Sequence, residues 1–270
     1  MTFANTSDTF RADNRQNKVA NRLAEALAQG GLALVYQPEI DLVSREVTSL
    51  EALCRWHDEE LGQVAPDEFI AVAEARGLIV PIGQYLLNQI LADLPLLMQR
   101  WPHARVAINV SGVELALPDF AEQVKARIQA ASTPLGKHLE FEVTESVFHH
   151  NVPVVRQNLL TLREAGLTIA IDDFGTGQSS LARLHTLPFD KIKLDRSFVQ
   201  ALEDPMVQAI VKSMVDLTDQ FSRTLVVEGI ETAQQMQQLI GLGCRVGQGY
   251  LLCRPCALQD LPTLLHWPGC

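Results

Sequence analysis

The chain has 270 residues, with 22 basic against 32 acidic side chains and a formal net charge of -10. Hydrophobic residues make up 47% and charged residues 20%, as in ordinary globular proteins, so a disordered, collagen-like or membrane-spanning chain is excluded. The acidic balance also argues against DNA, RNA or an anionic membrane surface as a partner, because sequence-independent binding to these needs clustered Lys and Arg.

The first residues are predicted to form a flexible lead-in. Residues 1–16 are polar and show almost no apolar periodicity. They lack the basic-then-apolar pattern of a secretory signal, and apolar runs along the chain stop well short of the ~18 residues that a spanning helix needs. We therefore expect a cytoplasmic protein with one folded domain over residues 17–270.

Beyond this segment, one pattern repeats along the chain: a short β-branched or aliphatic run, a turn, and an amphipathic helix. The predicted strands are 32–37, 47–53, 105–110, 139–145, 167–173, 191–195, 224–229 and 245–250. Gly166 and Gly243 each end a helical pattern, where a left-handed C-cap is expected. The alternation predicts an α/β fold, a TIM-like (β/α)8 barrel. A doubly wound sheet is the alternative, but no glycine-rich loop follows the first strand to support it.

Polar residues interrupt the apolar strands at matching positions. Burial of an unpaired carboxylate is costly, so each one in a core strand needs an explanation. They lie near the carboxyl ends of the predicted strands: Glu51, Asn109, Glu142, Asp172, Asp173, Lys193, Glu228 and Gln248. In a barrel these ends meet at one mouth, where barrel enzymes have their active sites.

So many acidic groups at one mouth would raise one another's pKa values, and one or two hard divalent cations would relieve the repulsion. Mg²⁺ and Mn²⁺ prefer carboxylate and amide oxygens, and a pair of such ions suits phosphodiester hydrolysis. Lys193 would then be a charge partner for the attacking water or a developing oxyanion. Taken singly, a strand-end Asp is more often a helix N-cap and a Lys often reaches solvent, but the repetition along successive strands favours a functional cluster.

Five cysteines are scattered along the chain, an odd number unlike a disulfide framework. Cys253 and Cys256 form a CxxC, but no second pair stands at zinc-finger spacing and no helical pattern begins there as in a thioredoxin-like motif. We expect these thiols to be reduced and structural or incidental.

Several segments together resemble the EAL domain family, bacterial phosphodiesterases that linearise the second messenger cyclic di-GMP. The name-giving triplet is Glu51, Ala52 and Leu53, within EALCRW. The other matching segments are YQPEIDL from Tyr36, PDEFIAVAE from Pro66, INVS from Ile108, EVTES from Glu142, DDFGTG from Asp172, KLDRSFV from Lys193, VEGIET from Val227 and QGYLLCRP from Gln248. The resemblance spans roughly residues 18 to 260 and implies a TIM-like barrel with one antiparallel strand.

The resemblance also implies a role for each matched residue. One or two Mg²⁺ or Mn²⁺ ions would be held by Glu51, Asn109, Glu142, Asp172, Asp173 and Glu228, with Asp172 as the bridge. Lys193 and Glu228 would flank the attacking water, and Glu51 completes the implied catalytic set. The implied substrate-binding residues are Gln37, Leu53, Arg55, Asp195 and Gln248. Glu145 would anchor the loop that begins at Asp172, which in this family links dimerisation to metal binding.

The implied activity is metal-dependent hydrolysis of cyclic di-GMP to linear pGpG, which lowers the level of the messenger in bacterial signalling. A homodimer is the implied assembly. The alternative is a cyclic di-GMP receptor or protein-interaction module that does not cleave the nucleotide, as in relatives that have lost the acidic set. A third possibility, a barrel enzyme acting on another phosphoester or an enolisable acid, does not predict Arg55 and Gln248 in their contexts.

Overall fold

The computed structural model describes residues 6–131, 136–144, 147, 150, 152–175 and 186–261, with side chains from residue 14 onward. The chain divides into two compact units. The first comprises the residues up to 34 together with 54–87, and the second comprises residues 35–53 and those from 88 onward. The two long strands β1 (Leu32–Asp41) and β2 (Val47–Asp58) each contribute residues to both units.

The first unit is built on helix α1 (Thr6–Gln29), which packs against α2 (Pro66–Arg76). The end of β2 forms a hairpin with β3 (Gly62–Val64), and the buried ring of Trp56 meets Phe69 edge-on, with centroids 5.9 Å apart. Helix α1 runs across the predicted domain boundary at residue 17, and Arg15 Nη2 donates to Glu68 Oε2 at 2.9 Å. Residues 6–16, predicted as a flexible lead-in, are therefore helical.

The second unit is a closed barrel. Its remaining strands are β4 (Arg105–Asn109), β5 (Leu139–Thr144), β6 (Thr168–Phe174), β7 (Lys191–Leu194), β8 (Thr224–Val227) and β9 (Val246–Gly247). The strand order β1-β9-β8-β7-β6-β5-β4-β2 closes because β1 also pairs with β2. Neighbours from β2 through β9 run parallel, whereas β1 is antiparallel to β9. The predicted barrel, including its one antiparallel strand, is confirmed.

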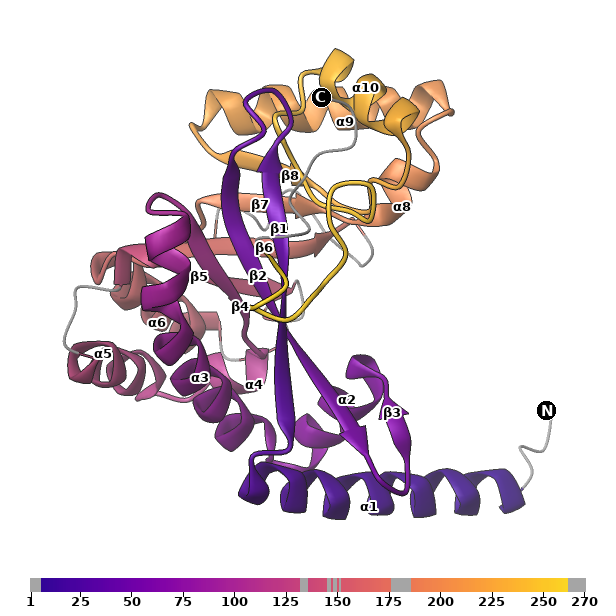
Figure 1. Ribbon diagram of the computed structural model, residues 1–270, viewed down its shortest axis with the longest axis vertical. Helices are drawn as coiled ribbons and strands as arrows, with labels where there is room; N and C mark the ends of the chain where they lie inside the picture. The colour runs from indigo at the N-terminus through magenta and orange to yellow at the C-terminus, as the bar shows by residue number, and fades with distance from the viewer. Residues whose placement is uncertain are drawn as a thin grey trace. The chain divides into compact units, whose positions relative to one another are not determined.

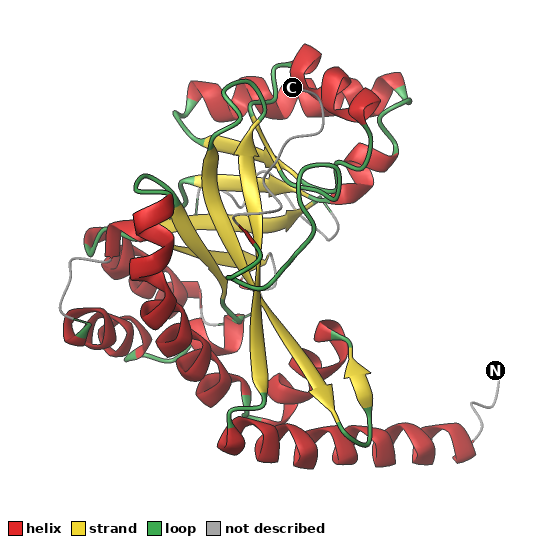
Figure 2. Ribbon diagram, viewed as in Figure 1, coloured by secondary structure: helices red, strands yellow, loops and turns green. Residues whose placement is uncertain are grey.

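Helices cover the outside of this barrel (Figures 1 and 2). They are α3 (Ile79–Arg100), α4 (Gly112–Leu115), α5 (Phe120–Ala130), the 3-10 turn Gly136–His138, α6 (Val152–Glu164), α8 (Arg196–Gln200), α9 (Pro205–Gln220) and α10 (Ala233–Leu242). Gly243 ends α10 with φ 98° and Gly166 follows α6 with φ 94°, so both predicted left-handed caps are confirmed. Such caps satisfy the last helical carbonyls directly before a strand begins.

Successive side chains of each strand point alternately outward and inward, so the barrel has an apolar outer face and a polar interior. On β5, Phe141 lies 6.1 Å from the ring of Phe120 on α5, so it faces the helices. Its neighbours Glu140 and Glu142 face the other way and contact lysines of β7. The hydrophobic core therefore lies between barrel and helices, while charged groups fill the interior.

Candidate active site

A fully buried lysine lies at the centre of the barrel interior. Lys193 Nζ is 2.8 Å from Glu228, 2.9 Å from Glu142, 3.3 Å from Glu51 and 3.4 Å from Asp172. Its side chain is 0% exposed, and β7 directs it into the barrel interior, where these carboxylates meet. Burial alone would lower its pKa, but the surrounding carboxylates outweigh burial and raise the pKa well above its usual value. Lys193 therefore stays protonated.

Glu51 is the most firmly oriented carboxylate of this cluster. Asn109 Nδ2 donates to Oε1 at 2.9 Å and Gln248 Nε2 donates to Oε2 at 2.8 Å. Burial acts to raise the pKa of Glu51, but the charge of Lys193 and these two amide donors lower it to about 2. Glu51 is therefore ionised, with each oxygen held by an amide donor.

Glu142 and Asp172 are held much less well. Neither oxygen of Glu142 accepts a well-directed hydrogen bond from the described residues, although the side chain is buried. Burial and the charge of Glu51 raise the pKa of Glu142 well above its usual value, and burial raises the pKa of Asp172 in spite of Lys193. Lys193 supplies a charge 2.9 Å from Glu142 Oε1 but no well-directed hydrogen bond, and a buried carboxylate without such a bond indicates that a further cation can bind here.

Two acidic residues near the mouth complete the cluster. Asp173, with φ 52° in the left-handed region, lies on the more exposed side, and Glu228 directly follows β8. Burial and the charge of Asp172 raise the pKa of Asp173 to about 6. Burial raises the pKa of Glu228 to about 8, against the opposing effect of Lys193.

The acidic groups form two overlapping triads that fit divalent cations. Ligand oxygens of Glu51, Glu142 and Asp172 lie within 4.8 Å of one another, and so do those of Asp172, Asp173 and Glu228. Asp172 belongs to both triads, as a bridging carboxylate must. An all-oxygen donor set with unsatisfied carboxylates suits hard ions that bind oxygen, and excludes a site built for soft metals.

Comparison with known proteins agrees with this geometry. The EAL domain family model matches residues 20–255. The chain belongs to the EAL domain family. It is 37% identical over 258 residues to the cyclic di-GMP phosphodiesterase PA2567 of Pseudomonas aeruginosa, a match covering 95% of this chain and 44% of that protein. The cyclic di-GMP phosphodiesterase RocR of the same organism is 36% identical over 86% of this chain and 59% of its own length.

Solved structures show the same EAL architecture. The PaMucR phosphodiesterase in complex with c-di-GMP superposes with a TM-score of 0.83 at 34% identity, covering 90% of this chain and 99% of that one. The EAL enzyme Bd1971, in a form bound to cAMP and cyclic di-GMP, gives a TM-score of 0.87 at 31% identity, covering 93% and 69%. The chain thus spans the whole solved MucR domain, but only 44% of full-length PA2567.

The barrel of this EAL domain brings together most of the sequence-predicted site. Glu51, Asn109, Glu142, Asp172, Lys193, Glu228 and Gln248 are joined by the contacts above, and Asp173 lies in the second triad. Glu51 lies in the middle of β2, which continues to Asp58, rather than at the predicted strand end.

The predicted substrate-binding residues differ in burial and in hydrogen-bond partners. Gln37 is buried and its amide donates to the carbonyl of Cys253 at 3.0 Å, while Leu53 is half-buried. Asp195 is the N-cap of α8 and accepts from Ser197 N at 3.0 Å. Arg55 belongs to the first unit, where its Nη1 donates to the carbonyl of Cys54 at 2.9 Å. Glu145 lies outside the described residues.

A second charged group in the EAL barrel was not predicted. Lys191 Nζ lies 2.6 Å from both Glu39 Oε2 and Glu140 Oε1, and all three side chains are almost completely buried. Lys191 and Glu140 come two residues before Lys193 and Glu142 and so point into the same interior. This period of two along β5 and β7 was the available sequence signal.

The cysteines in the described part of the chain are free thiols, as expected: Cys54, Cys244, Cys253 and Cys256. Cys253 Sγ donates to the carbonyl of Arg254 at 3.2 Å. Burial raises the pKa of Cys253 to about 12 and also raises that of Cys256. These are features of unreactive structural thiols. No helix within the described ranges combines the length and the hydropathy needed to cross a membrane.

Proposed function

We propose that this chain hydrolyses cyclic di-GMP to linear pGpG with Mg²⁺ or Mn²⁺, and so lowers the messenger level in the bacterial cytoplasm. The observation that carries the proposal is the pair of carboxylate triads around Lys193. The relatives named as cyclic di-GMP phosphodiesterases support the choice of substrate.

Glu51, Asn109, Glu142 and Asp172 would hold one ion, and Asp172, Asp173 and Glu228 would hold the other. When bound, the ions would polarise the phosphodiester as Lewis acids and lower the pKa of the attacking water. Besides these roles, the amides of Asn109 and Gln248 orient Glu51 by donating to its two oxygens. An oriented carboxylate needs no reorganisation when the reaction begins.

Lys193 and Glu228 have different roles: Lys193 stabilises charge on the phosphate, and Glu228 takes the proton from the attacking water. Because Lys193 stays protonated among carboxylates, it acts as a cation that stabilises negative charge on the phosphate oxygens. Glu228 is the better candidate for the general base, since its side chain is 19% exposed and it lies 2.8 Å from Lys193.

Residues away from the triads would bind the nucleotide. We assign substrate contacts to Gln37, Leu53, Arg55, Asp195 and Gln248. Asp195 has a competing structural use as the cap of α8, so its substitution should affect both α8 and binding. We also assign the loop anchor to Glu145 and a homodimer to the active assembly, on the family resemblance alone.

Product analysis separates this proposal from the receptor alternative. The purified chain is incubated with cyclic di-GMP and Mg²⁺ or Mn²⁺, and the nucleotides are separated by ion-exchange chromatography. We expect pGpG to appear and a chelator to stop its formation. Binding of cyclic di-GMP without pGpG would instead identify a receptor.

Glu51→Gln tests the assignment of the triads. It keeps the size of the side chain but removes the charge from an ionised ligand. We expect turnover to fall by about 100-fold or more, since a change in the groups that merely support a metal ligand already costs about 10–100-fold. The matched control is Glu59→Gln, at an exposed acidic position of the first unit, which should keep wild-type turnover. Wild-type activity in Glu51→Gln would refute the assignment.

A further inference from the structure

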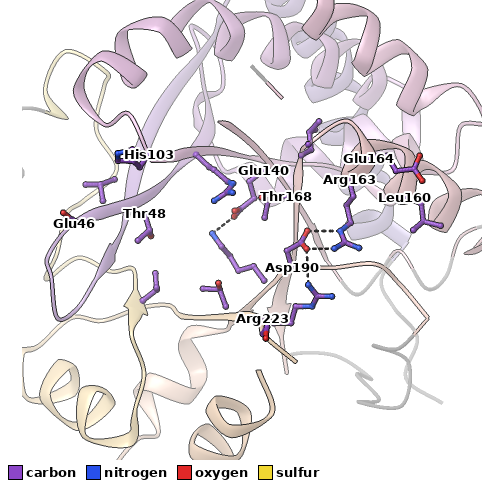
Figure 3. Close-up of a pocket in the computed structure, with 18 residues that line it drawn as sticks. Glu46, Thr48, His103, Glu140, Leu160, Arg163, Glu164, Thr168, Asp190 and Arg223 are labelled. Atoms are coloured by element: carbon purple, nitrogen blue, oxygen red, sulfur yellow. Dashed lines mark hydrogen bonds and ion pairs between the residues drawn. The ribbon is translucent and has the colours of Figure 1, made fainter. Parts of the chain in front are cut away.

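A second polar cavity lies at the opposite end of the barrel from the carboxylate triads. It has a volume of ≈ 820 Å³ and is lined by residues at the amino ends of the strands (Figure 3). Val47, Arg105, Lys191, Thr224 and Val246 are the first residues of β2, β4, β7, β8 and β9, respectively. The proposed catalytic groups lie toward the carboxyl ends, so this cavity is distinct from the catalytic mouth.

Most charges in the wall of this cavity are already paired. Glu140 accepts from Lys191 at 2.6 Å, and Asp190 accepts from Arg163 at 2.7 and 3.1 Å in a two-pronged contact, which is drawn in Figure 3. Arg223 donates a single hydrogen bond to Asp190, from Nη1 to Oδ1 at 3.3 Å. Two further carboxylates, those of Glu46 and Glu164, are exposed, so solvent and salt screen them.

Arg105 is the exception. It is half-buried and lines the cavity, yet no acceptor among the described residues bonds to its guanidinium. Its Nε is inaccessible to solvent and has no hydrogen-bond partner. Arginine presents several donors in a planar fork that matches carboxylate and phosphate oxygens, and a half-buried one without an acceptor is an available anion contact.

Other donors gather on the same wall. Thr168, Ser222 and Thr224, which carry hydroxyl groups, line the cavity together with Arg223, whose guanidinium makes one hydrogen bond to Asp190. The volume lies within the ~300–1,000 Å³ typical of small-molecule sites and is far larger than a single ion needs. A few polar groups in a concave site of this size favour a small organic anion.

We propose that this cavity, with Arg105 as its main anchor, is a second binding site for a small metabolite carrying a carboxylate or phosphate group. Arg105 binds the anionic group, Arg223 adds a second cationic contact, and the hydroxyls orient the rest of the molecule. Glu140 and Lys191 form part of the wall and are already joined to each other, so they do not compete for the ligand.

Calorimetry on the full chain tests this site. Metal is first removed with a chelating resin, so that the carboxylate triads repel anions rather than bind them. Citrate, inorganic phosphate and guanosine 5′-monophosphate are then titrated separately at a fixed ionic strength, which distinguishes carboxylate from phosphate ligands and a bare ion from a nucleotide. We expect saturable one-to-one binding of at least one of the three.

Two arginine variants provide the decisive comparison. Arg105→Gln should weaken binding by about tenfold or more, the loss expected for one charge-assisted hydrogen bond. Arg156→Gln removes the same charge from an exposed position on α6 outside the cavity and should leave the affinity within about twofold, as distant surface charges are screened. Absence of binding for all three probes, or equal loss in both variants, would overturn the proposal.

Hydrogen exchange on the wild-type chain gives a readout that does not depend on Arg105→Gln folding. A bound anion should slow exchange in peptides covering residues 103–105 and 222–224 and leave residues 108–110, near the catalytic mouth, unchanged. Slowing only at residues 108–110 would place the anion at the other mouth and refute the second site.

Discussion

Replacing Lys193 by Met tests whether the carboxylate cluster needs a cation. Met is close to Lys in length and apolar, so the change removes the charge with little change in packing. In the absence of metal, four carboxylates would then surround an uncharged side chain, because Lys193 contacts Glu51, Glu142, Asp172 and Glu228 within 3.4 Å.

The expected loss of stability is large. Breaking a buried ion pair by removing one partner costs about 3–5 kcal/mol, and Lys193 is 0% exposed. Without Lys193, repulsion among the carboxylates raises their folded-state pKa values above the unfolded values, so they take up protons and relieve part of that repulsion. The folded state then binds more protons than the unfolded state, so the free energy of unfolding of Lys193→Met should fall as pH rises from about 5 toward 8.

Urea unfolding in EDTA measures this loss directly. The control is Lys212→Met, which removes an exposed lysine paired with Asp216 and should cost less than about 1 kcal/mol. Mn²⁺ should restore part of the stability of Lys193→Met, by about 2.7 kcal/mol at 100 times its dissociation constant. A Lys193→Met variant within 1 kcal/mol of wild type in EDTA at pH 8 would refute the inferred role of Lys193.

Two further predictions concern the framework of the barrel. Asn158→Leu should lower the free energy of unfolding by about 2 kcal/mol in urea melts, because buried Asn158 donates to the carbonyls of Leu115 and Leu117 and these would lose their partner. The exposed neighbour Gln157→Leu is the control and should change it by less than about 0.5 kcal/mol. Burial raises the pKa of Cys244 to about 12, so its thiol stays protonated at pH 8 and iodoacetamide should modify it far more slowly in the native protein than in urea. Equal rates would contradict this assignment.

The barrel was predictable because its strands carry a strong local signal. Every predicted strand has a counterpart in the structure, and the polar residues that interrupt them converge as expected. Asp172 lies in both triads, whereas the residues alone indicated only that it would join the cluster.

Interactions between residues far apart in the sequence were harder to predict from the sequence. Lys191 lies 152 residues from Glu39 and 51 from Glu140, so their pairing depends on barrel closure, which no local pattern encodes. The first half of α1 was missed because its residues are polar and lack apolar periodicity. This part of the helix is held by tertiary contacts, such as the two hydrogen bonds that Arg15 donates to Glu68.

The structure shows where the acidic side chains behind the net charge of -10 lie. Part of this acidity is buried in the barrel rather than solvated. The acidic residues buried in the barrel interior are Glu39, Glu51, Glu140, Glu142 and Asp172. Buried carboxylates need a positive charge nearby. Lys191 provides it for Glu39 and Glu140, and Lys193 neutralises part of the charge of the catalytic carboxylates.

Anomalous diffraction from crystals grown with Mn²⁺ shows whether the carboxylate triads bind metal ions. We expect two peaks at the catalytic mouth, one bounded by Glu51, Glu142 and Asp172 and the other by Asp172, Asp173 and Glu228. A map with no peak between these carboxylates, from crystals containing saturating Mn²⁺, would contradict the proposed metal centre and the phosphodiesterase mechanism built on it.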